Sequence, residues 1–159
     1  IKTFLAGRCD AASSDGSNLA SVRATGVGNA DDYVILPELI SKEPLGPMVR
    51  RADDQWLDIV RWSILAMLEA EELGVTSANV EKMLAESKSP TVLRLLGKSG
   101  DFGKLMGLDN AWAYNIIKHV GNYSESFERN VGMGSPLKLQ RGVNALWSKG
   151  GLMYSIPFR

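Results

Sequence analysis

Cysteine and histidine are almost absent from the 159 residues, in which Cys9 and His119 are the sole examples. A single cysteine excludes a disulfide within the chain, and zinc sites and catalytic triads combine several ligating or titrating side chains. Because His119 lies far along the chain from Cys9, in a helical stretch, neither a metal site nor a catalytic thiol is predicted. Cys9 has two interpretations: a small buried thiol, or half of a disulfide whose partner lies upstream.

An excess of either charge is also lacking, because 18 Lys and Arg residues balance 18 Asp and Glu residues. Nucleic acids and anionic membranes attract basic proteins, so neither is predicted as a partner. The longest apolar stretch, Trp56 to Leu68, contains Asp58 and Arg61 and is not expected to cross a membrane. Since Ile1 is not a methionine, we expect that the natural start lies upstream or was removed.

No motif for a cofactor or for catalysis is complete. Gly97-Lys98-Ser99 has the end of a phosphate-binding loop, but that motif needs a glycine where Val92 stands. Glu69, Glu71 and Glu72 lie together at the end of a predicted helix, which we interpret as a solvated helix end. The sequence therefore predicts no cofactor, no metal and no enzymatic activity.

The first 50 residues combine short helices with short strands. In order, the pattern predicts a helix that stops at Gly7, a strand over 11–14, a helix over 17–24 and a buried strand over 33–36. Pro37, Pro44 and Pro47 lie in the segment 37–47 that follows this strand. Since proline donates no backbone hydrogen bond, this segment is expected to cross as a stiff connection.

Helices dominate the rest of the chain. They are predicted over 55–73, 76–87, 90–96, 109–120, 123–131 and 137–147, with a glycine-rich loop over 97–108. The first of these carries apolar residues around most of its circumference and is expected to be buried on nearly all sides. The four tryptophans are interpreted as core residues: Trp56, Trp62, Trp112 and Trp147. The fold class is therefore α/β, with a few strands followed by a mostly helical region.

Asp15 stands between the strand over 11–14 and the helix that begins at Ser17. Open α/β sheets present ligand-binding groups at the carboxyl ends of their strands, so Asp15 is a candidate ligand-binding residue. The alternative is that Asp15 only caps the helix that follows. Ser14 and Ser17 are candidates for additional hydroxyl contacts.

Several segments together resemble a known family. Gly7-Arg8-Cys9-Asp10-Ala11 is followed by Asp15, then by Asp31-Asp32-Tyr33-Val34-Ile35-Leu36-Pro37-Glu38, Ser41-Lys42-Glu43-Pro44-Leu45-Gly46-Pro47 and Trp56-Leu57-Asp58-Ile59-Val60-Arg61-Trp62. These segments resemble the amino-acid-binding proteins of bacterial ABC transporters, and in particular the general L-amino-acid branch of the type II periplasmic binding proteins. The resemblance covers the whole chain and implies that it is the C-terminal half of such a protein.

The resemblance implies a division into two lobes. Residues 1–43 would be the end of the second, ligand-binding lobe, and 44–159 the return through the hinge and the C-terminal part of the first lobe. The hinge would lie around Ser41 to Gly46, and Leu45 to Arg50 would be the strand that returns to the first lobe. Because the chain has few strands of its own, its sheets would need strands from the missing N-terminal half.

The resemblance also implies roles for the candidate residues. Asp15 matches the aspartate that pairs with the α-ammonium group of the ligand, and Asp10 matches a structural position. The residues that bind the α-carboxylate would lie in the missing half, since neither Arg8 nor Arg23 matches that role.

The implied function is to bind free L-amino acids in the periplasm and to deliver them to the membrane permease of an ABC transporter. Two alternatives remain from the residues alone. A dehydratase or lyase on the same fold would need an acid or base beside Asp15, which the sequence does not show. A helical interaction module would use the apolar faces of 53–159 to dock on a partner. If the chain exists alone, we expect exposed apolar surface and self-association.

Overall fold

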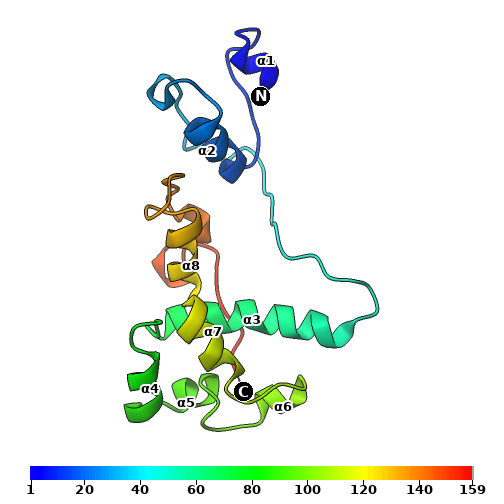
Figure 1. Ribbon diagram of the computed structural model, residues 1–159, viewed down its shortest axis with the longest axis vertical. Coiled ribbons are helices and arrows are strands. Elements are labelled where there is room, and N and C mark those ends of the chain that lie inside the picture. Colours follow the sequence, from blue (N-terminus) through cyan, green and yellow to red (C-terminus); the bar gives the residue numbers. More distant parts are fainter. Residues whose placement is uncertain (159) are drawn as a thin grey trace. The chain divides into compact units, whose positions relative to one another are not determined.

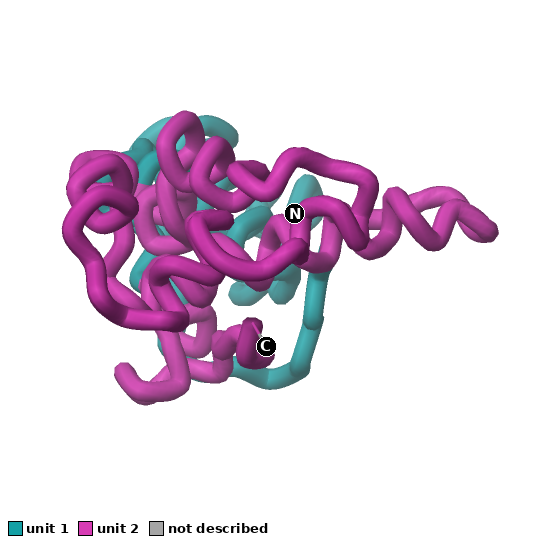
Figure 2. The backbone as a smooth tube through the Cα atoms, turned by 90° about the horizontal axis from the view of Figure 1, so that it is seen from below, with its two compact units in different colours: residues 1–46, 129–140 teal, residues 47–128, 141–159 magenta. Residues whose placement is uncertain are grey.

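The computed structural model describes residues 1–158 and divides the chain into two compact units (Figure 2). Unit 1 comprises residues 1–46 and 129–140. Unit 2 comprises residues 47–128 and the chain from 141 onward. The elements of both units are helices and turns, and the described residues contain no strand (Figure 1).

Unit 1 contains two α-helices and one short 3-10 turn: α1 (Lys2–Leu5), α2 (Gly16–Thr25) and η1 (Ala30–Asp32). After α1 the chain reverses at Gly7, whose φ of +68° is in the left-handed region that favours glycine. Both helices agree with the predicted ones. Ala20 is the one apolar residue of unit 1 that is buried within the described chain.

The three strands predicted for 11–14, 33–36 and 45–50 are wrong for this chain, because all three segments lack regular structure. The prediction of a buried strand also fails on burial, since Val34 is 81% and Leu36 is 68% exposed. A strand is stable only where neighbouring strands pair with its amides and carbonyls. The described residues supply a single isolated bridge, between Leu146 and Met153. The α/β fold class is thus seen only in its helical part.

Unit 2 is built around α3 (Asp54–Glu72), the longest helix. Asp53 caps it by accepting a hydrogen bond from the Trp56 amide, and Gly74 ends it with φ of +67°. We expected α3 to be buried on nearly all sides. This is confirmed only near its C-terminal end, where Ala66, Leu68 and Ala70 are buried. Near its start, Trp56 is 51% exposed, which corrects its interpretation as a core residue.

Five further helices follow α3: α4 (Val80–Glu86), α5 (Pro90–Leu95), α6 (Phe102–Leu105), α7 (Trp112–Val120) and α8 (Tyr123–Asn130), whose last two residues belong to unit 1. α3 and α4 both pack against α5 and α7. α6 is a turn of helix inside the segment predicted as a loop. α4 begins later than predicted because Asn79 folds back to accept a hydrogen bond from the Thr76 amide.

An aromatic cluster lies in the core of unit 2. Phe158 is 1% exposed, and its ring lies 5.1 Å from Trp62 and 5.2 Å from Phe102, measured between ring centroids. The Trp112 ring stacks against both Phe102 and Phe158, with centroid distances of 6.5 Å and 6.4 Å. Arg94 fixes the same end of the chain, since its Nη1 donates a 2.6 Å hydrogen bond to the Phe158 carbonyl. Trp62 and Trp112 are therefore packing residues, as predicted.

The helix predicted for 137–147 is wrong. The chain there forms only a 3-10 turn, η2 (Gly142–Asn144), followed by η3 (Trp147–Lys149). Lys138 and Gly142 have φ of +53° and +48°, which interrupt any continuous α-helix over 137–147. Trp147 is 63% exposed, so it is not a core residue. Gly151 is needed here because a Cβ atom would collide with the carbonyl of Ala145.

Candidate functional site

The predicted ligand-binding residues gather at the start of α2 in unit 1. Asp15 is the N-cap residue, and its carbonyl accepts a 2.9 Å hydrogen bond from the Leu19 amide. Its exposed side chain makes no capping hydrogen bond. The Asp15 carboxylate therefore does not cap α2, which was the alternative to ligand binding.

Ser14 and Ser17 lie on either side of Asp15 and are both exposed. The Ser14 hydroxyl accepts a 2.8 Å hydrogen bond from Asn18 Nδ2, which holds the entry into α2. Arg23 Nε donates a 3.0 Å hydrogen bond to the carbonyl of Ala30. The start of α2 therefore presents one carboxylate and two hydroxyls next to the positive end of the helix dipole.

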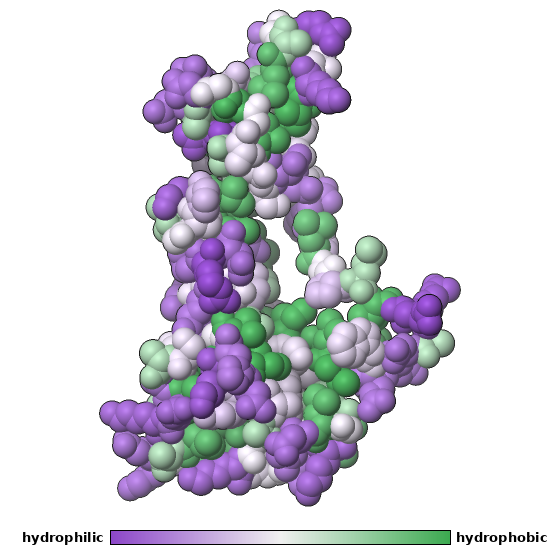
Figure 3. All heavy atoms as spheres, in the orientation of Figure 1, coloured by the Kyte–Doolittle hydropathy of each residue, from purple (hydrophilic) through white to green (hydrophobic). Residues whose placement is uncertain are grey.

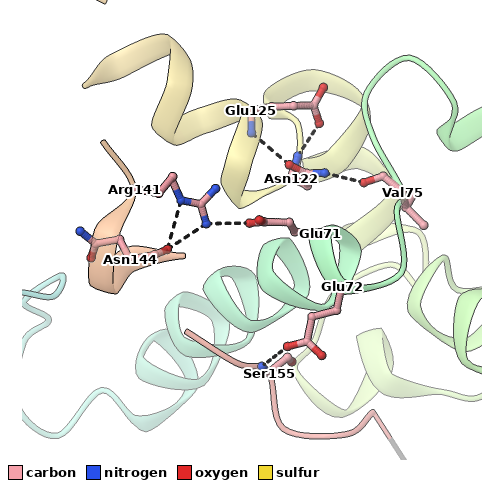
Figure 4. Close-up of polar contacts among 8 residues, drawn as sticks. All are labelled: Glu71, Glu72, Val75, Asn122, Glu125, Arg141, Asn144 and Ser155. Atoms are coloured by element: carbon pink, nitrogen blue, oxygen red, sulfur yellow. Dashed lines mark hydrogen bonds and ion pairs between the residues drawn. The ribbon is translucent and has the colours of Figure 1, made fainter. Parts of the chain in front are cut away.

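A second polar cluster, buried in unit 2, was not predicted. Figure 4 shows Arg141 between Glu71 of α3 and the carbonyl of Asn144. Arg141 Nη2 lies 3.0 Å from Glu71 Oε2, and the two side chains are only 16% and 5% exposed. The guanidinium also lies 5.2 Å from the ring centroids of Tyr123 and Phe127. A buried carboxylate is costly unless it is paired, and Arg141 supplies the pair.

Glu125 and Asn122 form a second part of the same region, also drawn in Figure 4. Asn122 Oδ1 accepts from the Glu125 amide at 3.0 Å, and Glu125 Oε2 accepts from the Asn122 amide at 2.8 Å. This reciprocal pair is a capping box at the start of α8. Asn122 Nδ2 also donates to the Val75 carbonyl, and Ser77 donates its hydroxyl to Glu125. The sequence could have predicted this capping box, because Asn122 and Glu125 have the spacing Asn-x-x-Glu.

Glu69 and Glu72 hold the segment that leads to the end of the chain. The Ser155 amide donates a 2.9 Å hydrogen bond to Glu72 Oε1 (Figure 4), and Glu69 is 7% exposed. Burial raises the pKa of Glu69, and the nearby charge of Glu72 raises it further, while a hydrogen bond from Ser155 opposes the shift. The interpretation of 69–72 as a solvated helix end is thus wrong for Glu69 and Glu71.

The buried polar groups of unit 2 are structural in their chemistry. Among residues 1–158, no buried side-chain nitrogen or oxygen lacks a hydrogen-bond partner. The same residues contain no group of three His, Cys, Asp or Glu side chains that could hold a metal ion. Cys9 is an exposed free thiol, which corrects its interpretation as a buried one. No helix within 1–158 is long and apolar enough to cross a membrane.

The chain is similar to binding proteins of bacterial transporters. It is 56% identical over 156 residues to the general L-amino acid-binding periplasmic protein AapJ of Rhizobium johnstonii, and 55% identical over 156 residues to the glutamate/glutamine/aspartate/asparagine-binding protein BztA of Rhodobacter capsulatus. These matches cover 97% and 98% of this chain, but 45% and 46% of the relatives. The chain is a relative of the binding proteins of amino-acid ABC transporters.

A solved structure agrees with this relationship. An ABC transporter periplasmic binding protein from Brucella ovis, determined with glutathione bound, is 54% identical and superposes with a TM-score of 0.90. The match covers 99% of this chain and 49% of that one. No family model matches. The chain spans about half the length of the binding proteins that it matches, and these relatives are named as binding proteins rather than as enzymes.

Proposed function

We propose that this chain is the C-terminal half of the periplasmic solute-binding component of an ABC transporter, and that the whole protein binds free L-amino acids. The observation that carries the proposal is identity of 54–56% over 97–99% of the chain to proteins of this class. Residues 1–43 then belong to the ligand-binding lobe, and residues 44–159 return through a hinge around Ser41 to Gly46. The partners would be the remaining half and the membrane permease.

Asp15 is the proposed partner of the ligand's α-ammonium group, with Ser14 and Ser17 as hydroxyl contacts. The exposed Asp15 carboxylate makes no capping hydrogen bond, so it is available to pair with an ammonium ion. The α-carboxylate would be bound by residues outside this chain. Binding energy from both lobes would favour the closed form, as in other hinged binding proteins.

The names of the relatives suggest which part of the ligand is recognised. AapJ is named a general L-amino acid binder, BztA a binder of four acidic and amide amino acids, and the Brucella ovis protein was solved with glutathione. All these ligands contain an α-ammonium beside an α-carboxylate, because the γ-glutamyl group of glutathione keeps both free. We infer that this head group is recognised and that the side chain is tolerated more broadly.

The test is a thermal melt of the whole protein from which this chain derives, with single L-amino acids and with glutathione. A ligand at 100 times its Kd should stabilise the protein by about 2.7 kcal/mol and raise the Tm. Asp15→Asn should weaken binding by about 10- to 100-fold, since it removes a hydrogen bond to a charged group. Asp31→Asn, which changes another exposed carboxylate of unit 1, should leave the affinity unchanged.

Absence of any ligand-dependent change in Tm, or equal losses in both variants, would contradict the proposal. Conversion of a bound ligand into a product would instead support the dehydratase or lyase alternative.

A further inference from the structure

A cavity of about 280 Å³ lies within unit 2 and is lined by α3, by α5 and by the segment that ends at Phe158. Glu69 and Glu72 line it from α3, and Thr91 and Arg94 line it from α5. The members of each pair are three positions apart, which places them on one face of their helix. The cavity therefore has an acidic wall on α3 and a basic wall on α5.

The charges on the two walls do not neutralise each other. Among residues 1–158, the ion pairs include none of Glu69, Glu72 and Arg94. Arg94 Nη1 donates to the Phe158 carbonyl, and Glu72 Oε1 accepts from the Ser155 amide (Figure 4). Both of these bonds are to backbone groups without a net charge, so the charges of Arg94 and Glu72 remain uncompensated.

Glu69 gives the strongest indication that the acidic wall binds a cation. Hydrophilic residues are frequent on the face of the molecule drawn in Figure 3, where water solvates them, but Glu69 is only 7% exposed. Its burial and the charge of Glu72 raise its pKa, although Ser155 donates a hydrogen bond to it. An ammonium group between the two carboxylates opposes both effects, because it pairs with the charged form of each.

The basic wall fits an anion. Arg94 uses Nη1 for the Phe158 carbonyl, whereas its Nε and Nη2 have no hydrogen-bond partner among residues 1–158. These two nitrogens form one edge of the guanidinium, and such an edge can bind a carboxylate through two parallel hydrogen bonds. The hydroxyl of Thr91 lies on the same wall and can donate a further hydrogen bond. A molecule that carries both an ammonium and a carboxylate group complements both walls.

We propose that this cavity binds a small zwitterion of the amino-acid type, with its ammonium group between Glu69 and Glu72 and its carboxylate at Arg94. The volume is just below the roughly 300–1,000 Å³ of typical small-molecule pockets, so the ligand is about as small as glycine or alanine. The cavity belongs to unit 2, whereas Asp15 belongs to unit 1. The two are separate sites, and this inference does not depend on the proposed function.

Three small probes test the charge pattern on the whole protein. Glycine carries both charged groups, methylammonium carries only the cation and acetate only the anion. NMR follows the amide shifts of Thr91, Arg94 and Ser155 in the Asp15→Asn variant, in which the proposed site on α2 is weakened. Glycine should bind with a Kd at least about 10-fold lower than either other probe, because only glycine bonds to both walls. Equal Kd values for the three probes, or no shift with glycine, would overturn the proposal.

A matched pair of variants tests the acidic wall. Glu72→Gln keeps an oxygen for the Ser155 amide but removes the charge, so the Kd for glycine should rise about 10-fold or more. Glu86→Gln changes a carboxylate of α4 that is 69% exposed and does not line the cavity, and it should leave the Kd unchanged. An unchanged Kd in Glu72→Gln, or equal losses in both variants, would contradict the proposal. If Glu72→Gln fails to fold, the comparison of the three probes still decides.

The same NMR titration of the wild-type protein separates this inference from the proposed function. Glycine-dependent shifts at Ser17 and Leu19 of α2, without shifts at Thr91 and Arg94, would overturn the cavity site and leave the proposed function standing. Shifts at Thr91 and Arg94 alone would support the cavity site, even if no L-amino acid changes the amides of α2.

Discussion

Arg141 is the residue on which the polar interior of unit 2 depends. Its guanidinium neutralises Glu71, whose side chain is 5% exposed, and it donates to the Asn144 carbonyl from Nε at 3.1 Å and from Nη2 at 2.8 Å. A single side chain thus satisfies a buried charge on α3 and a backbone oxygen of η2. Removing one partner of such a pair is worse than removing both, because the other charge stays buried.

Arg141→Met should therefore lower the free energy of unfolding by about 3–5 kcal/mol, while keeping much of the side-chain volume. Urea denaturation, followed by tryptophan fluorescence, measures this loss. The control is Lys118→Met, which breaks an exposed ion pair with Glu81 that is 2.6 Å long and should barely change the midpoint. Equal midpoints for the two variants would show that burial of the Glu71 pair has no energetic consequence.

Glu69 should make unit 2 less stable as the pH rises. Burial and the charge of Glu72 raise its pKa in the folded protein above the ordinary value of 4.5, so the folded state holds this proton more tightly than the unfolded state. The stabilisation is complete below pH 4.5 and is lost as the pH passes through the raised pKa.

Glu69→Gln removes this titration but keeps an oxygen for Ser155. Its Tm relative to wild type should rise from just above pH 4.5 towards neutral pH, in a series of melts. Glu86→Gln changes a carboxylate whose side chain is 69% exposed and should run parallel to wild type. A constant difference between Glu69→Gln and wild type at all pH values would rule out the raised pKa as the cause.

At the scale of elements, the end of the described chain holds the helices of unit 2 together. Phe158 packs against both Trp62 of α3 and Phe102 of α6, and Arg94 of α5 donates to its carbonyl. Phe158→Ala should cost about 3–5 kcal/mol, because it leaves a cavity among aromatic rings. Trp147→Ala, at a site that is 63% exposed, should cost far less. Chemical denaturation of both variants compares the costs, and similar losses would contradict the assignment of Phe158 to the core.

Helices and strands differ in how far the sequence could predict them. α3 has a long apolar face, with the cap Asp53 just before it and Gly74 just after it, so local patterns located it. The strand predicted over 33–36 would need neighbouring strands that the described chain does not provide, and the segment has no regular structure there. The prediction of a helix over 137–147 was wrong because Lys138 and Gly142 have positive φ, which the spacing of apolar residues does not reveal.

At the scale of the whole molecule, the two units differ in how many apolar residues they bury. The buried apolar residues of the described chain lie almost entirely in unit 2, and unit 1 contributes Ala20 alone. The sequence led to Asp15 through its place before a helix, and the structure puts it at the N-cap of α2. The Glu71–Arg141 pair escaped prediction because its members are 70 positions apart in the sequence.

The position of Phe158 also affects how the protein is made. Trp62 emerges during synthesis 96 residues before Phe158, the aromatic ring that completes its packing. At ordinary rates of translation this interval lasts about 5–20 s. During that time the rings of Trp62, Phe102 and Trp112 lack the aromatic partner that Phe158 supplies. We therefore expect this chain to depend on chaperones that bind unfinished chains, and to be lost when translation stops just before residue 158.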